Sequence, residues 1–337
     1  MIRRIAVPVL LAALAIGLAA CGEKKETTTT TGSEHVDLVL DYLPNADHAG
    51  IYDAIASGEF KQAGLDVAPR TPSDPSAPLK LLEAGKADLA ISYEPELLLA
   101  RDKGAKLISI GALVQRPLTS LISLGGANAI HRPAQLEGKK VGTAGIPYQD
   151  AYLQTILTQA GADAARVHSV NVGFNLIPSL LTKRVDATLG MFWNVEGVEL
   201  ARRKKQPVIL RMDQIGVPTY DELVIVARES EVHTRGAMLR RFMRALARGQ
   251  ERLRTNVDAG VAALVKANPD LDVALQRAQV RATLPAFFPA SKSEPFGFQV
   301  PGEWQRYAAW MARNKLISNA NIAQRAYTNE FLPGEGI

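Results

Sequence analysis

Short apolar runs alternate with longer amphipathic segments along most of this chain. Residues 36–41 alternate apolar and polar side chains with the period of two that is typical of a half-buried strand. Residues 49–57 carry apolar side chains at helical spacing, and Gly58 follows where a helix would end. This change of period recurs as far as residue 210. Strands that alternate with helices in this way predict parallel sheets covered by helices on both faces.

The same pattern predicts the other elements of the chain. Beyond the last predicted strand, at residues 223–227, the sequence is expected to be mainly helical. The earlier strands are predicted at residues 65–67, 87–92, 107–114, 119–124, 140–144, 167–170, 187–191 and 208–210, and the helices at residues 77–84, 95–103, 149–160, 176–182 and 196–204.

An internal repeat singles out two strand ends. Residues 88–94 contain an Asp, an apolar strand and a Tyr-Glu pair, in that order. Residues 186–196 repeat this order, with a Phe-Trp-Asn-Val-Glu cluster after the strand. Open α/β sheets bind their ligands in the crevice beyond the carboxyl ends of the strands. Two such ends that face each other predict a ligand cleft between two lobes.

Composition and charge narrow the class of protein. The chain has 337 residues, of which 47% are hydrophobic, enough to build one or two domains around an apolar core. Without residues 1–20 it loses Arg3 and Arg4, so that 37 of its 39 Lys and Arg remain against 34 Asp and Glu. So small an excess does not indicate a nucleic-acid partner. Cys21 is the only cysteine, so no disulfide is expected within the chain.

The N-terminal residues have the pattern of a bacterial export signal. Arg3 and Arg4 precede an apolar run at residues 5–18, which is too short to span about 30 Å of hydrocarbon as a permanent helix. A cysteine directly after small residues resembles the lipobox of bacterial lipoproteins, and a plain secretory signal is the alternative. We therefore expect a signal peptide at residues 1–20, a lipid on Cys21, a disordered tether at residues 21–34 and a folded body anchored to the outer face of the cytoplasmic membrane.

Seven segments carry motifs with a family resemblance, at residues 40–48, 58–67, 85–89, 136–142, 192–199, 220–223 and 327–332. They resemble the type II periplasmic-binding fold of solute-binding proteins, and within it the NMT1/THI5-like branch that serves thiamine-pyrimidine import. The resemblance implies two doubly wound α/β lobes joined by a two-strand hinge, with residues 35–122 and 223–337 in lobe I and residues 123–222 in lobe II. It also implies a monomeric protein without a cofactor, which binds hydroxymethylpyrimidine or formylaminopyrimidine and delivers it to the permease of an ABC transporter.

A pyrimidine ligand sets the chemistry that its site must provide. An aminopyrimidine is a flat ring with hydrogen-bond donors and acceptors on its rim, so it needs an aromatic face and fixed polar side chains. Trp193 is predicted to provide the face, opposed by Tyr42 or Tyr93, and a place in the core is the alternative. Glu196 is predicted to bind the exocyclic amine, or else only to favour the N-terminus of the next helix. Asn45 is expected either to read the rim or to stabilise a turn.

Further candidates lie at strand ends and at the expected crossovers between the lobes. Tyr148 follows a Gly-Ile-Pro turn at a helix start, where backbone N–H groups gather. The crossovers are expected near residues 121–124 and 221–224, so one of Asp221 and Glu222 is expected to orient the hinge instead of the ligand. The complete set of candidate ligand-binding residues is Asp41, Tyr42, Asn45, His48, Tyr93, Glu94, Tyr148, Trp193, Asn194, Glu196, Tyr220, Asp221 and Glu222.

The same scaffold supports two other functions. Yeast pyrimidine-forming synthases resemble this chain, but they carry a cysteine-rich run before the segment that matches residues 223–227 and a histidine after the strand that ends here at Ser92. Residues 212–220 contain no cysteine and residues 95–103 contain no histidine, so the sequence predicts a binding protein and not an enzyme. A carrier of riboflavin, a sulfonate or another heterocycle stays open, because flavin-type relatives share the Asp-Tyr-Leu-Pro-Asn motif. The cluster at residues 193–196 favours a pyrimidine.

Overall fold

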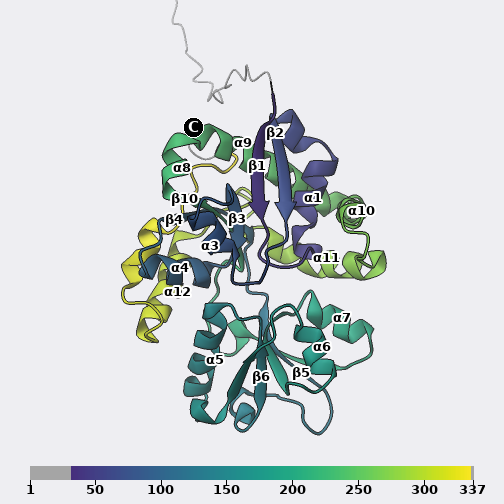
Figure 1. Ribbon diagram of the computed structural model, residues 1–337, viewed down its shortest axis with the longest axis vertical. Coiled ribbons are helices and arrows are strands. Elements are labelled where there is room, and N and C mark those ends of the chain that lie inside the picture. The colour runs from purple at the N-terminus through teal and green to yellow at the C-terminus, as the bar shows by residue number, and fades with distance from the viewer. Residues whose placement is uncertain (1–31, 335–337) are drawn as a thin grey trace, which may run out of the picture.

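The computed structural model describes residues 32–334, which form two α/β lobes, each built around a five-stranded sheet (Figure 1). The predicted signal peptide and Cys21 lie outside these residues. In order across the sheet, the first lobe contains β2 (Leu65–Arg70), β1 (Glu34–Val39), β3 (Leu89–Ser92), β10 (Leu223–Arg228) and β4 (Leu107–Val114). The second lobe contains β7 (His168–Asn171), β6 (Lys140–Thr143), β8 (Ala187–Phe192), β5 (Thr119–Leu124) and β9 (Pro207–Arg211).

The two sheets share one strand order. In the first lobe β1 pairs in parallel with β2 and β3, and β10 is inserted antiparallel between β3 and β4. In the second lobe β6 pairs in parallel with β7 and β8, and β5 is inserted antiparallel between β8 and β9. Each inserted strand is the first that the chain forms after it arrives from the other lobe. The predicted doubly wound lobes with two crossings are therefore confirmed.

The internal repeat extends to individual hydrogen bonds. Asp88, just before β3, accepts a bond from the Asp37 backbone N–H at 2.8 Å and donates its own N–H to the Asp37 carbonyl at 3.0 Å. Asp186, just before β8, makes the same two bonds with the backbone of Lys140, both at 2.8 Å. The strands β3 and β8 therefore hold equivalent places in their sheets, and their carboxyl ends both face the other lobe.

The first crossing lies earlier in the chain than the sequence predicts. The strand β5 was expected in the same block as β4, with the lobe boundary after residue 122, but it pairs with β8 and β9 of the second sheet. The chain therefore crosses at residues 115–118 and returns at residues 215–222. An apolar strand pattern does not reveal which distant strands it will pair with, so the boundary was misplaced by a few residues.

Helices cover both lobes, and the last third of the described chain is mainly helical, as predicted. Among residues 32–334 no helix is both long enough and apolar enough to span a membrane. The first lobe carries α1 (Ala49–Ala56), α2 (Glu59–Gln62), α3 (Pro78–Glu83), α4 (Glu94–Asp102), α8 (Glu229–Thr234), α9 (Gly236–Thr255), α10 (Val257–Ala267), α11 (Val273–Phe287) and α12 (Pro301–Arg313). The second lobe carries α5 (Pro147–Gln159), α6 (Leu176–Leu181) and α7 (Glu196–Arg202). The short 3₁₀ turns are η1 (Ala46–His48), η2 (Pro133–Leu136), η3 (Ala164–Arg166), η4 (Met212–Gln214) and η5 (Ala320–Arg325).

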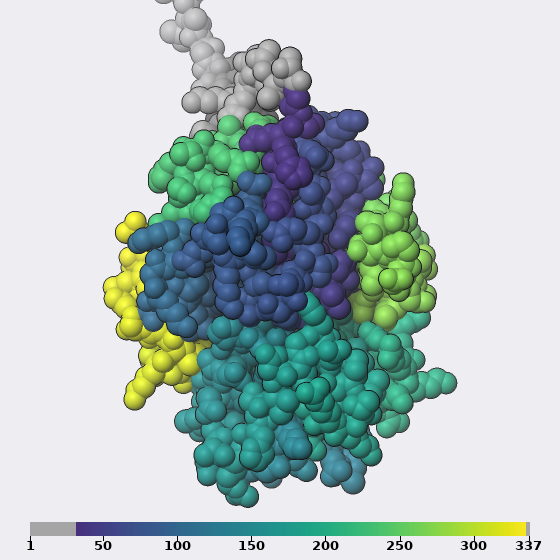
Figure 2. All heavy atoms as spheres, viewed as in Figure 1, coloured from purple at the N-terminus to yellow at the C-terminus, as the bar shows by residue number. Residues whose placement is uncertain are grey.

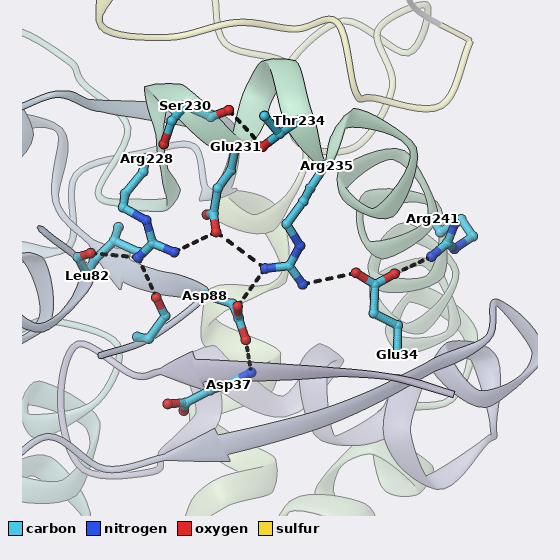
Figure 3. Close-up of polar contacts among 11 residues, drawn as sticks. Glu34, Asp37, Leu82, Asp88, Arg228, Ser230, Glu231, Thr234, Arg235 and Arg241 are labelled. Atoms are coloured by element: carbon cyan, nitrogen blue, oxygen red, sulfur yellow. Dashed lines mark hydrogen bonds and ion pairs between the residues drawn. The ribbon is translucent and has the colours of Figure 1, made fainter. Parts of the chain in front are cut away.

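An ion-pair network fixes the start of β1 against the helices that follow β10 (Figure 3). Arg235 contacts the carboxylates of Asp88 at 2.6 Å and Glu34 at 3.0 Å, and Arg241 contacts Glu34 at 2.6 Å. Glu231 joins the same group through Arg235 at 3.3 Å. Glu34 is the first residue of β1, at the end of the first lobe away from the second lobe (Figure 1). The network therefore holds the entering chain far from the interface between the lobes.

Candidate ligand-binding site

A narrow cavity lies between the lobes, at the carboxyl ends of strands from both sheets. It encloses about 310 Å³ of non-atom space, part of which opens to solvent. Figure 2 shows the atoms of the second lobe packed directly against those of the first on the face in view. The structure is therefore a closed form. The cavity is lined by Asp41, Tyr42, Asn45 and Tyr93 of the first lobe and by Ala144, Ile146, Gln149, Gly190, Phe192, Val195 and Glu196 of the second.

The carboxylate of Asp41 is held in place from two sides. Its Oδ2 accepts a hydrogen bond from the Tyr93 hydroxyl at 2.8 Å, and its Oδ1 lies 2.8 Å from His48 Nε2. The Nδ1 atom of His48 accepts the Asn45 backbone N–H at 3.2 Å, which places the imidazole proton on Nε2, where it is donated to Asp41. His48 is fully buried and does not line the cavity, so it orients Asp41 instead of contacting a ligand.

Asn45 lines the cavity, but its amide group stabilises the local backbone. Its Oδ1 accepts the Asp47 N–H at 2.8 Å and caps η1, while its Nδ2 donates to the Leu43 carbonyl at 3.0 Å. The turn role that the sequence left open for Asn45 is therefore present in the structure. Asn45 therefore shapes the wall of the cavity, while its amide group holds the loop in position.

Aromatic side chains from both lobes form the walls of the cavity. The Tyr93 ring lies 6.4 Å from Phe192 and 5.2 Å from Tyr148, both of the second lobe. Tyr42 meets the edge of Phe174 of the second lobe at 4.8 Å. Each such contact contributes about 0.5–1.5 kcal/mol beyond the buried area. Tyr148 is buried behind Tyr93 and does not reach the cavity.

Glu196 brings a second carboxyl group into the cavity from the first residue of α7. Its Oε2 accepts the Phe192 backbone N–H at 2.8 Å, which fixes its direction. Burial raises the pKa of Glu196 to about 7, although the hydrogen bond from Phe192 opposes this change. A carboxyl group with such a pKa exists in both protonation states near neutral pH, so it can either accept two hydrogen bonds or donate one and accept one.

Gln149 and Gly190 belong to the cavity and were not predicted. Gln149 is buried at the start of α5, where its Oε1 accepts the Ala144 N–H at 2.8 Å. A methyl group on Gly190 would lie 2.3 Å from Gln149 Nε2, and Gly190 also has a φ of +114°. A side chain at this position would therefore collide with the Gln149 amide and displace it. A glycine inside an apolar strand is the sequence signal that could have indicated this close approach.

Trp193 lies outside the cavity, contrary to the expectation that it forms one face. Its indole Nε1 donates to the Pro117 carbonyl at 3.1 Å, and the Arg211 guanidinium covers the ring at 4.6 Å from its centre. The residue before it, Phe192, lines the cavity instead. Neighbouring residues at the end of a strand point to opposite faces. A prediction that is wrong by one residue therefore selects a side chain that packs elsewhere in place of the one that lines the cavity.

Tyr220 and Asp221 belong to the returning crossing between the lobes, Glu94 of α4 bonds to that crossing, and none of the three lines the cavity. Glu94 Oε2 accepts the Asp221 backbone N–H at 2.7 Å, and Asp221 Oδ2 accepts the Trp304 indole N–H at 2.9 Å. Burial and then repulsion by Asp221 raise the pKa of Glu94 well above its usual range, and burial raises the pKa of Asp221 to about 7. These acids pack against each other in the interior of the hinge region.

Glu222 ties the two crossings together. Its carboxylate accepts the backbone N–H groups of Leu118 and Thr119, the latter at 2.8 Å, and the Thr119 hydroxyl at 2.7 Å. The Tyr220 hydroxyl adds a fourth bond at 3.0 Å. Burial raises the pKa of Glu222 to about 7, against the effect of these donors. In this structure both Asp221 and Glu222 serve the hinge, where the sequence expected only one of them to do so.

Asn194 bridges the lobes without lining the cavity. Its Nδ2 donates to Asp47 Oδ1 at 2.7 Å and to Thr283 Oγ1 at 2.6 Å, both in the first lobe.

Within residues 32–334 no group of three or more His, Cys, Asp or Glu side chains is placed to hold a metal ion. The cavity is therefore a site of carboxyl groups, aromatic rings and one buried amide.

Comparison with known sequences identifies similar proteins. The family model described as NMT1/THI5 like matches residues 45–258. A formylaminopyrimidine-binding protein from Halalkalibacterium halodurans is 31% identical over 314 residues, which cover 93% of this chain and 94% of that protein. A putative thiamine biosynthesis protein from Haemophilus influenzae is 34% identical over 305 residues, covering 90% and 94%. A 4-amino-5-hydroxymethyl-2-methylpyrimidine phosphate synthase from Legionella pneumophila is 26% identical over 301 residues, covering 88% and 92%.

Solved structures share the fold at low sequence identity. The alkanesulfonate-binding protein SsuA from Xanthomonas axonopodis pv. citri superposes with a TM-score of 0.68 and 14% identity, over 89% of this chain and 99% of that one. The periplasmic aliphatic sulphonate-binding protein SsuA from Escherichia coli gives a TM-score of 0.66 at 16% identity, over 89% and 99%. The predicted type II periplasmic-binding fold is therefore confirmed.

Proposed function

Because this chain belongs to the NMT1/THI5-like family, we propose that it is an extracytoplasmic substrate-binding protein that carries a thiamine-precursor pyrimidine to an ABC importer. The observation that carries the proposal is the cavity between the lobes, which is lined by Asp41 of the first lobe, Glu196 of the second and aromatic side chains of both. The name of the relative from Halalkalibacterium halodurans supports formylaminopyrimidine as the ligand, and hydroxymethylpyrimidine is the alternative that we propose.

The cavity offers a pyrimidine what its rim and faces require. Tyr42, Tyr93 and Phe192 provide flat apolar surfaces for the ring. Glu196 can accept a bond from the exocyclic amine with one oxygen while its other oxygen meets the adjacent ring nitrogen, because its pKa of about 7 allows it to carry or release the shared proton. Asp41 is held by His48 and Tyr93 and is thereby pre-oriented towards the ligand.

The lining disfavours two other kinds of ligand. A sulfonate is an anion, whereas the cavity is lined by two carboxyl groups and by none of the Lys, Arg or His side chains of the described chain. Riboflavin has three fused rings and a polar tail, whereas the closed cavity encloses only about 310 Å³ of non-atom space, part of which opens to solvent. A single small ring is the ligand class that this cavity favours.

A carrier role is favoured over catalysis. The relatives at 31% and 34% identity are named as a binding protein and a thiamine biosynthesis protein, while the relative named as a synthase is at 26%. In the sequence, residues 212–220 lack the cysteines and residues 95–103 lack the histidine that the yeast synthases carry. We further propose that a lipid on Cys21 anchors the monomeric protein outside the cytoplasmic membrane, where the closed form docks on a permease.

Isothermal titration calorimetry on residues 22–337 tests the proposed ligand. We expect one of hydroxymethylpyrimidine and formylaminopyrimidine to bind with a Kd below about 1 μM, which corresponds to about −8.2 kcal/mol. Thiamine, riboflavin and an alkanesulfonate serve as the competing ligands in the same buffer. Tight binding of riboflavin or the sulfonate, with no heat from either pyrimidine, would contradict the proposal.

The adjacent residues Trp193 and Phe192 make a matched pair of variants. Phe192→Ala removes a wall of the cavity, so we expect the pyrimidine Kd to rise at least about tenfold. Trp193→Ala removes the contacts with Pro117 and Arg211 instead, so we expect the Kd to change less than about threefold while the free energy of unfolding falls by about 1–3 kcal/mol. Calorimetry and urea denaturation measure both quantities. If Trp193→Ala raised the Kd more than Phe192→Ala did, the Trp193 indole would be the side chain that contacts the ligand.

A further inference from the structure

A polar cluster outside the cavity joins the two lobes beside the ligand-binding wall. Asn194 of the second lobe donates to Asp47 at 2.7 Å and to Thr283 of α11 at 2.6 Å. Gln279 of α11 donates to the Val195 carbonyl at 2.9 Å. All of these side chains are at most 1% exposed. All three of these bonds cross between the lobes, so the cluster can form only when the lobes are closed.

The cluster adjoins the cavity without being part of it. Val195 and Glu196 line the cavity, and they directly follow Asn194 in the chain. Asn194 and Gln279 therefore fix the backbone from which Glu196 projects. Asp47, in turn, lies in the same loop as Asp41, whose carboxylate lines the cavity from the other side. Opening of the cluster would move both carboxyl groups apart.

Three buried oxygens in this cluster have no donor: Gln279 Oε1 and one oxygen on each of Asp47 and Asn194. Asp47 Oδ2 and Asn194 Oδ1 are both acceptors enclosed by protein, and neither has a hydrogen-bond partner. A buried acceptor without a donor is destabilising, so two of them in one pair are unfavourable. A proton on Asp47 Oδ2 would turn this atom into a donor. It could then bond to Asn194 Oδ1, so that neither oxygen would lack a partner. Asp47 and Asn194 would then pair as a carboxylic acid and an amide, each donating to the other.

We propose that Asp47, Asn194 and Thr283 form a latch that holds the lobes closed over the ligand, and that the latch closes with the uptake of one proton by Asp47. The proton comes from hydronium in the solvent: one of its O–H bonds breaks, water is left, and a new O–H bond forms at Asp47 Oδ2. The inference rests on the ligand-binding function proposed above, since it describes how the same cavity closes. Asp47 and Asn194 are positioning residues in this scheme, because they act on the ligand through Glu196 and Asp41.

The surroundings of Asp47 favour its neutral form in the closed state. Burial, and then repulsion by Asp41 and Glu196, raise the pKa of Asp47 well above its usual range, although the bonds from Asn194 and Thr283 oppose this. His48, the next residue, is occupied by Asp41. On the helices packed against η1, Arg277 of α11 pairs with Asp258 of α10, Asp53 of α1 pairs with Arg252 of α9, and Arg281 and Lys266 are exposed.

The direction of the pH effect follows from this pKa difference. In an open form Asp47 is hydrated, so its pKa returns towards about 3.9. Closure raises the pKa, so the closed form binds the proton more tightly than the open form does. The stabilisation of the closed form is fully present at a pH below the open-form pKa and is lost as the pH rises through the closed-form value. Ligand affinity is therefore expected to fall as the solution becomes alkaline.

The test compares five variants of residues 22–337 by calorimetry with the tightest-binding pyrimidine across about pH 5–9. Asp47→Asn imitates the protonated acid, so we expect its Kd at low pH to stay within about threefold of the wild type and its affinity to fall less with pH. Asp47→Ala and Asn194→Ala leave a partner unpaired, so the Kd rises at least about tenfold at low pH. Asn194→Asp combined with Asp47→Asn restores one acid and one amide, so this double variant binds more tightly than Asn194→Asp alone. Glu196 also titrates, and it is identical in all variants, so only differences between the pH profiles are interpreted.

A ligand-free measurement separates this proposal from the proposed function. Small-angle scattering of the wild type without ligand should give a radius of gyration that rises with pH as the lobes open, and Asp47→Asn should reduce this rise. A radius of gyration that changes in this way supports the latch even if no pyrimidine binds. The latch is overturned if Asp47→Asn weakens binding as much as Asp47→Ala in folded protein, or if its pH profiles match those of the wild type. Thermal unfolding of each variant shows which of them are folded.

Discussion

Glu196→Gln is expected to weaken pyrimidine binding at least about tenfold, since a hydrogen bond to a charged group contributes about 1.5–3 kcal/mol. The glutamine keeps an oxygen that can accept the Phe192 backbone N–H, as Glu196 Oε2 does at 2.8 Å, so the wall of the cavity keeps its shape. Its NH₂ group then faces the exocyclic amine of the ligand, and two donors cannot pair. It also cannot share a proton with the ring nitrogen. Titration calorimetry at neutral pH measures the change.

A carboxyl group on the same helix serves as the control for Glu196. Glu199 of α7 forms a surface ion pair with Arg203 and does not line the cavity. Such pairs contribute about 0–1 kcal/mol to stability, so Glu199→Gln is expected to leave the Kd within about twofold of the wild type. If the two variants bound equally well, Glu196 would have no direct role in binding, and its place at the start of α7 would be its only function.

Glu222→Ala is expected to lower the free energy of unfolding by about 3–5 kcal/mol, because each buried donor left without an acceptor costs about 1–3 kcal/mol. The substitution leaves the N–H groups of Leu118 and Thr119 without the carboxylate that now accepts them. It also releases the hydroxyls of Thr119 and Tyr220 and separates the two crossings. Urea denaturation measures the loss. Glu251→Ala, at an exposed ion pair with Arg254, is the control and should cost less than about 1 kcal/mol.

The pH dependence of stability gives a second test of Glu222. Its pKa is about 7 in the folded protein and about 4.3 in the unfolded chain, so its contribution to stability is fully present below about pH 4.3 and is lost as the pH rises through 7. Glu222→Gln removes this titration. We expect its free energy of unfolding, relative to the wild type, to improve between about pH 5 and about pH 8. A constant difference over this range would mean that Glu222 does not change its protonation state.

The sequence predicted the architecture well because hydrophobic periodicity is a local property. The strands and most helices lie within a few residues of their predicted positions, and the repeat around Asp88 and Asp186 corresponds to equivalent strands with the same hydrogen bonds. The placement of β5 was wrong because strand pairing, unlike hydrophobic periodicity, is not a local property. Its pairing with β8 and β9 depends on residues that follow it by many positions in the chain, and the apolar pattern of β5 carries no information about them.

The candidate site was predicted in part. Asp41, Tyr42, Asn45, Tyr93 and Glu196 do line one cavity, because they lie at strand ends that the topology brings together. The choice between Phe192 and Trp193 depends on which face of β8 turns inward, and Gly190, two residues before Phe192, shows that this face is the cavity side. The roles of His48, Asn194 and Glu222 could not be read from the sequence, because each depends on a partner in another element.

A crystal structure of residues 22–337 grown with the pyrimidine that binds most tightly would show where the ligand lies. We expect the ring in the cavity between the lobes, against Tyr42, Tyr93 or Phe192, with its amine and adjacent ring nitrogen at the Glu196 carboxyl group. We also expect Trp193 still to be covered by Arg211 and not in contact with the ring. A ring stacked on Trp193, or bound away from both Asp41 and Glu196, would contradict the proposed site.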